Sequence, residues 1–209
     1  MSWVSVVLLA CLAVCVGAAA EVRDTLREQP PYPVWPDRFH AVSQQKRGED
    51  LGIVDLYYDW PRGGNLNLIR QADGPIFDME WGNGTSYVYT PATQKCKVVK
   101  FGVGLLPPDW LHGAQYLGRE TVGLFECHKW QKGDSDAPGV PFVVYWDAVA
   151  EDAAQAQRRP VQWRFFDGMQ FNVVYFTPHE AVPESVWQTP AYCFEQGEGE
   201  GGGRAEAAR

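Results

Sequence analysis

Residues 51–90 hold three aromatic-rich extended patterns separated by turn signals, and they limit the fold more than any other stretch does. The first pattern places four apolar side chains on one face of a strand: Val54, Leu56, Tyr58 and Trp60. A Pro-Arg-Gly-Gly break follows it, and Gly82-Asn83-Gly84 later predicts a tight hairpin turn. Short alternating segments joined by tight turns favour an antiparallel β-sheet.

The same alternation continues along the chain and predicts nine or ten short strands with little helix. The predicted strands are 39–45, 51–60, 65–71, 76–81, 85–90, 95–103, 122–130, 140–147, 161–166 and 171–176. One helical turn is expected at 107–113, between prolines and a glycine, and a short exposed helix at 148–158. So long a sheet curls, so we expect a mainly β fold, a single curved antiparallel sheet forming a barrel or half-barrel, with one or two short helices.

The ends of the chain predict a secreted protein. Residues 1–20 resemble a cleaved signal peptide, because an uncharged apolar run of about 13 residues precedes three alanines. We then expect an extended lead-in at 21–36, one β domain at 37–195 and a disordered Gly/Glu-rich tail at 196–209. We expect no transmembrane segment after signal cleavage, and we expect the product in the secretory-pathway lumen or outside the cell.

Charge and motifs argue against several classes of function. The net charge is −8 and basic residues are scattered, which disfavours a nucleic-acid partner. The four histidines stand far apart and Cys-x-x-Cys is absent, so we expect no metal site. Without a nucleophile elbow or a phosphate-binding glycine loop, we expect no cofactor and identify no catalytic residue.

Cysteines and a sequon add two expectations about covalent modification. Of the five cysteines, Cys96, Cys127 and Cys193 remain after signal cleavage. We expect a disulfide between Cys96 and Cys127, which would close a short loop, with Cys127–Cys193 as the rival pairing. Asn83 begins an Asn-Gly-Thr sequon at the predicted hairpin tip and is the expected glycosylation site.

The aromatic residues are the candidate ligand-binding groups. The candidates lie in or next to predicted strands: Tyr58, Trp60, Trp81, Trp146 and Trp163. They fit a large aromatic core, an apolar pocket for a lipid-like ligand on the concave face, or an exposed platform that stacks on sugar rings.

Asp78 and Glu80 lie two residues apart in one predicted strand, so their carboxyl groups share a face. Such a pair can hold a cation or act as the two carboxyls of a glycosidase. The ordinary interpretation is the solvated face of an antiparallel strand, and we expect that one here.

Six blocks of the chain resemble an uncharacterised family of secreted proteins from land plants and green algae. The blocks are 36–40, 55–69, 80–90, 103–118, 159–168 and 187–194, and the second reads Asp-Leu-Tyr-Tyr-Asp-Trp-Pro-Arg-Gly-Gly-Asn-Leu-Asn-Leu-Ile. Members of this family often carry the label "transferase, transferring glycosyl groups", which implies glycosyl transfer. At 62–65 the chain has Arg-Gly-Gly-Asn where the family usually has Asn-Gly-Arg-Asn.

The Tyr-Asp and Gly/Arg block is also similar to ependymin-type secreted proteins. That similarity implies the curved half-barrel shared with bacterial lipoprotein carriers, which binds apolar ligands. We therefore expect a protein that binds an apolar or amphipathic ligand on its concave face. The alternative is a carbohydrate-active protein, either a glycosyl-transfer enzyme or a cell-wall sugar-binding module.

Overall fold

The computed structural model of the protein describes residues 29–102, 104–135, 139–150 and 157–195. The fold lies in the compact unit that begins at Tyr32. The predicted signal peptide, the Gly/Glu-rich tail and most of the predicted helix at 148–158 lie outside the described residues.

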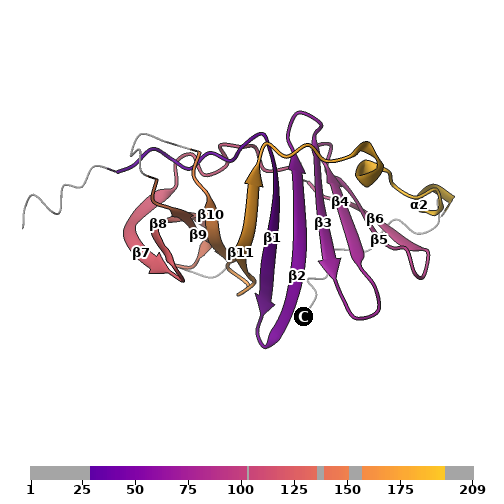
Figure 1. The fold of residues 1–209 in the computed structure, drawn as a ribbon, viewed down its shortest axis with the longest axis horizontal. Coiled ribbons are helices and arrows are strands. Elements are labelled where there is room, and N and C mark those ends of the chain that lie inside the picture. The colour runs from indigo at the N-terminus through magenta and orange to yellow at the C-terminus, as the bar shows by residue number, and fades with distance from the viewer. Residues whose placement is uncertain (1–28, 103, 136–138, 151–156, 196–209) are drawn as a thin grey trace, which may run out of the picture. The chain divides into compact units, whose positions relative to one another are not determined.

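Eleven strands form one antiparallel sheet that does not close, which confirms the predicted fold class (Figure 1). The strands are β1 (Arg38–Arg47), β2 (Asp50–Asp59), β3 (Gly64–Arg70), β4 (Ile76–Trp81), β5 (Thr85–Thr90), β6 (Lys95–Lys100), β7 (Gln115–Val122), β8 (Phe125–Asp134), β9 (Pro141–Ala148), β10 (Pro160–Phe165) and β11 (Gln170–Pro178). Their order is β6-β5-β4-β3-β2-β1-β11-β10-β9-β8-β7. Two meanders, β1–β6 and β7–β11, therefore join where β1 pairs with β11.

The sequence pattern does not predict β7, and it places the turn between β7 and β8 inside a strand. The sequence pattern predicts a continuous strand at 122–130, but β7 ends at Val122 and β8 begins at Phe125. Gly123 has φ +59°, a conformation that glycine adopts without steric cost, and Leu124 at the turn is 98% exposed. An exposed leucine in an otherwise alternating pattern hides the turn from the sequence.

Where the structure describes the chain, helical structure is confined to short segments. Residues 107–113 form consecutive turns, with Trp110 N donating to Pro107 O at 3.0 Å and His112 N to Asp109 O at 2.7 Å, instead of the predicted helical turn. The helices are η1 (Glu184–Trp187), a 3₁₀ helix, and α2 (Tyr192–Glu195). Among the described residues, no helix has both the length and the apolar character needed to cross a bilayer.

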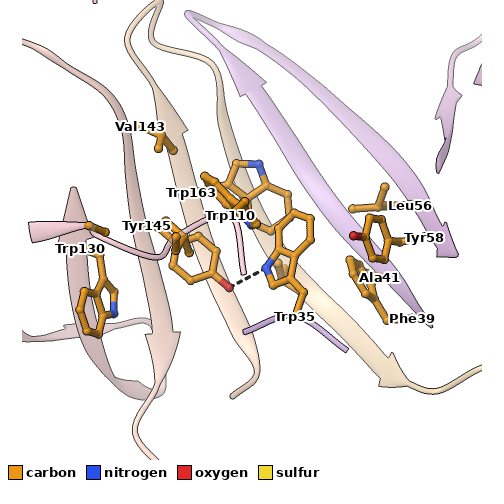
Figure 2. Packing of buried hydrophobic residues seen from close by; sticks show 13 residues of the cluster. Trp35, Phe39, Ala41, Leu56, Tyr58, Trp110, Trp130, Val143, Tyr145 and Trp163 are labelled. Carbon is orange, nitrogen blue, oxygen red and sulfur yellow. Dashed lines mark hydrogen bonds between the residues drawn. The ribbon is translucent and has the colours of Figure 1, made fainter. Parts of the chain in front are cut away.

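The inner face of the sheet, which carries Val54, Leu56 and Tyr58, packs against two irregular segments, 32–36 and 105–114. Trp35 lies at the centre of this core, and its Nε1 donates to the Tyr145 hydroxyl at 3.0 Å (Figure 2). Trp35 N also donates to Pro108 O at 2.8 Å, so the two segments are hydrogen-bonded to each other. Large aromatic rings bury much apolar area, which holds these irregular segments against the sheet.

The outer face of β3–β6 has its own cover, the C-terminal segment that includes η1 and α2 (Figure 1). Leu66 and Met79 are fully buried on this face and pack in one cluster with Trp187. We call residues 180–195 the C-terminal strap. Because the strap covers the outer face, this half of the sheet is shielded from solvent on that side.

The predicted disulfide is wrong: Cys96 pairs with Cys193, and Cys127 is a buried free thiol. Cys96 lies on β6, at one edge of the sheet, whereas Cys127 lies on β8, next to the opposite edge. The two residues are close in sequence, but the second meander returns from the far side of β1. The observed bond instead attaches the strap to the outer face.

Candidate functional site

A cavity of about 360 Å³ lies on the inner face. Residues of both β4 and β10 line it, although β3, β2, β1 and β11 separate these strands in the sheet. Two such distant strands can border one small cavity only if the sheet curves around it. The inner face is therefore the concave face, where the sequence predicted a functional site.

Six aromatic residues contribute to the apolar wall of the cavity: Trp35, Tyr58, Trp110, Trp163, Phe165 and Phe171. Trp35 meets Tyr58 and Trp110 edge to face, with ring centroids 5.5 and 5.3 Å apart. The Tyr58 hydroxyl donates to Leu106 O at 2.7 Å, which holds the 105–114 segment over the cavity. These ring contacts and this hydrogen bond hold the residues of the aromatic wall in place through contacts within the protein.

The opposite side of the cavity is polar, because β3 and β4 present four polar side chains on the same face. Asn65 pairs in register with Glu80, and Asn67 pairs with Asp78. Asn65 Nδ2 donates to Glu80 Oε2 at 2.9 Å, and the Ser86 hydroxyl donates to Asp78. Alternation along β3 and β4 therefore places amides and carboxyls together at one end of the cavity. Trp163, Phe165 and Phe171 come from β10 and β11, which lie beyond β1 in the sheet.

Asp78 and Glu80 are neighbours on the same face of β4, and burial changes their acidity. Burial, together with the neighbouring Asp78 charge, raises the pKa of Glu80 to about 7. Burial also raises the pKa of Asp78, against the opposing effect of hydrogen bonds from Ser86, Glu80 and Asn67. Near neutral pH the pair therefore retains a proton that two solvated carboxylates would have released.

The expectation of a solvated face for Asp78 and Glu80 is wrong, since both side chains are half-buried in the cavity wall. Two acids at positions i and i+2 of a strand give the same sequence pattern whether their face meets solvent or lines a cavity. Here the strap covers the outer face and the curvature of the sheet encloses the inner one. The two carboxyl groups also stand side by side on one strand, whereas those of a glycosidase stand ~5 Å or more apart across the scissile bond.

The structure brings two of the five candidate aromatic residues together at the cavity, Tyr58 and Trp163. Trp60 follows the end of β2 and is 39% exposed, so it does not share the face of Tyr58 as the alternation predicted. Trp81 lies on the outer face against Trp187, with ring centroids 6.3 Å apart.

Trp146 also lies away from the cavity, on the outer side of β9. Its Nε1 donates to Glu120 at 3.1 Å, and the Lys129 ammonium group lies 5.3 Å from its ring centroid. In the described part of the chain, six tryptophans are buried: Trp35, Trp110, Trp130, Trp146, Trp163 and Trp187. This is the arrangement of a core and a cavity wall, and it differs from an exposed row of rings that stacks on sugars.

Sequence reasoning missed several polar residues of the site, namely Ser43, Gln45, Asn65 and Asn67. The Asn-x-Asn alternation at 65–67 was visible in the sequence, and it faces Asp78 and Glu80 across the β3–β4 pair. Ser43 lies where the pairing of β1 with β11 shifts register, and nothing in a single strand predicts that irregularity. Among the described residues, no cluster of three or more His, Cys, Asp or Glu side chains has a metal-binding arrangement.

Solved structures of other proteins match this chain at low sequence identity. A protein described as an uncharacterized conserved protein from Thermus thermophilus superposes with a TM-score of 0.52 at 14% identity, covering 83% of this chain and 95% of that one. MucB matches at 13% identity with a TM-score of 0.42, over 75% of this chain and 58% of that one. The MucA/MucB complex of Pseudomonas aeruginosa matches at 13% identity with a TM-score of 0.44, over 75% and 56%.

The similarity to the Thermus protein, at this low identity, concerns the fold alone. No curated protein matches the sequence. The family model described as "Domain of unknown function (DUF8395)" matches residues 34–193, which is most of the chain and spans all eleven strands. The chain therefore belongs to the DUF8395 family.

Proposed function

We propose that this protein binds an amphipathic small molecule in the cavity on the concave face of its sheet. The observation that carries the proposal is the composition of the cavity, with the aromatic rings of β10 and β11 at one end and Asn65, Asn67, Asp78 and Glu80 of β3 and β4 at the other. Ligand pockets in proteins are mostly apolar with a few placed polar groups that orient the ligand.

The size of the cavity limits the ligand. A volume of about 360 Å³ is near the lower end for small-molecule pockets, which begin at ~300 Å³. The expected ligand is therefore a single-chain or single-ring amphiphile and not a lipid with two long chains. Burying its apolar part would stabilise the complex by roughly 25 cal/mol for each Å² removed from water.

Two features support binding over sugar chemistry. The two carboxyl groups lie side by side on β4 instead of flanking a space for a glycosidic bond. The tryptophans are largely buried, so they are better placed to form a wall than a flat stacking surface. Both features favour the binding hypothesis over the carbohydrate-active alternative.

Native mass spectrometry of the protein secreted from a eukaryotic host tests this proposal. We expect a bound small molecule that is lost on denaturation and is then identified in the organic extract. Ile69→Trp places a larger side chain in the cavity and should abolish the bound mass. Leu68→Trp, on the opposite face of the same strand, is the control and should keep the bound mass.

Protein that carries no ligand, and that binds none from a panel of single-chain amphiphiles, would contradict the proposal. So would a bound mass that survives Ile69→Trp in a variant with an unchanged circular dichroism spectrum.

The compartment is also part of the proposal: a secreted protein, released from its signal near residue 20 and glycosylated at Asn83. Asn83 is exposed in the β4–β5 turn, and its Oδ1 accepts a hydrogen bond from Thr85 N at 3.0 Å. A glycan on Nδ2 leaves that bond in place, and the disulfide suits an oxidising compartment. Deglycosylation should reduce the mass of the secreted wild type but not that of Asn83→Gln, and an unchanged wild-type mass would refute the glycan.

A further inference from the structure

Buried aspartates elsewhere in the described part of the chain have cationic partners. Asp55 is paired with Arg70 at 2.7 Å, Asp59 with Arg38 at 3.1 Å, and Asp147 with Arg158. This is the expected arrangement, because removing a carboxylate from water is unfavourable unless a positive charge or several donors compensate.

Asp78 and Glu80 differ from these three aspartates. Over the described residues, Ser86 donates a hydrogen bond to Asp78, Asn65 donates one to Glu80, and no Lys, Arg or His forms an ion pair with either acid. Two carboxyl groups thus share one side of an apolar cavity without a protein cation. A cationic ligand would supply the missing charge.

A separate observation also points to a ligand in this cavity. The Ser43 hydroxyl and the Trp110 Nε1 belong to residues of the cavity wall and are buried, yet within the described structure they have no hydrogen-bond partner. Ser43 is 1% exposed and Trp110 is 8% exposed, so their isolation from water is unfavourable. A bound molecule would satisfy the indole N–H only through an acceptor atom on its body, because an ammonium group has donors and no acceptor.

We propose that the ligand is an amphipathic amine, whose ammonium group binds Asp78 and Glu80 while its largely apolar body lies along the aromatic wall. This inference rests on the proposed function and specifies the polar end of the ligand. An ammonium group carries three donors and a positive charge, and its hydrogen bonds to carboxylates are about twice as strong as those between neutral groups. A ligand with a carboxylate end would instead be repelled by the pair.

Three probes with the same chain and different polar ends test the inference: decylamine, decanol and decanoate. Isothermal titration calorimetry of the full-length protein at neutral pH should show decylamine binding at least about tenfold more tightly than decanol, with decanoate weakest. The double variant Asp78→Asn with Glu80→Gln should reduce decylamine affinity to the level of decanol. Decanol binding should persist in that variant, which also shows that the cavity remains folded.

A matched control separates local recognition from net charge. Asp73→Asn with Glu49→Gln removes two exposed acids outside the cavity and changes the net charge at least as much as the double variant does. This control should keep the preference for decylamine over decanol.

The possible outcomes distinguish the inference from the proposed function. Equal affinity for decylamine and decanol, or a preference that survives in the double variant, overturns the inference and leaves amphiphile binding intact. Calcium binding that disappears in the double variant, without any preference for the amine, also overturns it and assigns the pair to a metal. If none of the three probes binds, the proposed function itself fails.

Discussion

Trp35 Nε1 donates a hydrogen bond of 3.0 Å to the hydroxyl of Tyr145, a residue 110 positions away on β9 (Figure 2). This bond joins the irregular segment that covers the inner face to the second meander of the sheet. Tyr145 is fully buried, so the hydroxyl and the indole depend on each other for hydrogen bonding.

Tyr145→Phe should therefore destabilise the protein by about 1–2 kcal/mol, because it leaves the Trp35 indole N–H buried without its acceptor. Chemical unfolding followed by tryptophan fluorescence measures the change. Tyr175→Phe, at a half-exposed ring on β11, is the control and should change stability by less than ~0.5 kcal/mol. Equal effects of the two substitutions would show that the bond between Trp35 and Tyr145 is unimportant.

Removing the disulfide with Cys96→Ser and Cys193→Ser should lower the free energy of unfolding by about 3–5 kcal/mol. The bond closes a loop with a sequence separation of 97 and restricts the unfolded chain, and it also holds the strap on the outer face. Urea unfolding with and without reductant measures the loss, and reductant should lower the wild type to the level of the variant. Cys127→Ala should keep the sensitivity to reductant, since Cys127 is a free thiol.

Glu80 should make stability depend on pH. Its pKa in the folded protein is raised by burial to about 7, above the ordinary 4.5, so the folded state binds the proton more tightly than the unfolded chain. This contribution to stability is fully present below pH ~4.5 and is lost as the pH rises through ~7.

Glu80→Gln resembles the protonated form, and its stability relative to the wild type should rise by about 2 kcal/mol between pH ~5 and ~8. The quantity to follow is the difference in the free energy of unfolding between Glu80→Gln and the wild type at each pH. The pKa of buried His128 is lowered to about 4, so both lose stability as the pH falls from 6.5 towards 4. Glu49→Gln, at an exposed residue, should show no such rise, and a pH-independent difference for Glu80→Gln would contradict the argument.

Two fully buried serines offer a matched test of ligand binding against stability. Ser86 donates to Asp78, whereas Ser43 has no partner within the described residues. Ser43→Ala should leave stability unchanged or raise it by up to about 1 kcal/mol, while Ser86→Ala should lower it by about 1–2 kcal/mol. If Ser43 serves the ligand, Ser43→Ala should also weaken amphiphile binding in calorimetry. Destabilisation by Ser43→Ala equal to that by Ser86→Ala would show that Ser43 has a structural role.

The strands and their antiparallel pairing were predictable because both depend on neighbours in the chain. Alternation from Leu51 onward, and turns such as Gly82-Asn83-Gly84, specify which residues extend and which reverse direction. Strands that follow one another through a short turn then pair. This local reasoning accounts for both meanders apart from the hairpin at Gly123, where a short turn lies within an apolar pattern.

What lies against each face of the sheet depends on contacts between distant parts of the chain. Alternation places Tyr58 opposite Tyr57 on the two sides of β2, but it does not say that one side borders a cavity and the other meets the strap. For the same reason Trp81 and Trp146 were candidates for the cavity, although both lie on the outer side of the sheet.

The sequence alone determined an antiparallel β protein rich in aromatic residues, since periodicity and turn chemistry act over a few residues. The pairing of β1 with β11, the disulfide from Cys96 to Cys193 and the burial of Asp78 and Glu80 were decided only in the tertiary structure. Each of these joins residues far apart in the chain. Their meeting depends on how the whole sheet curves and on which segments cover it.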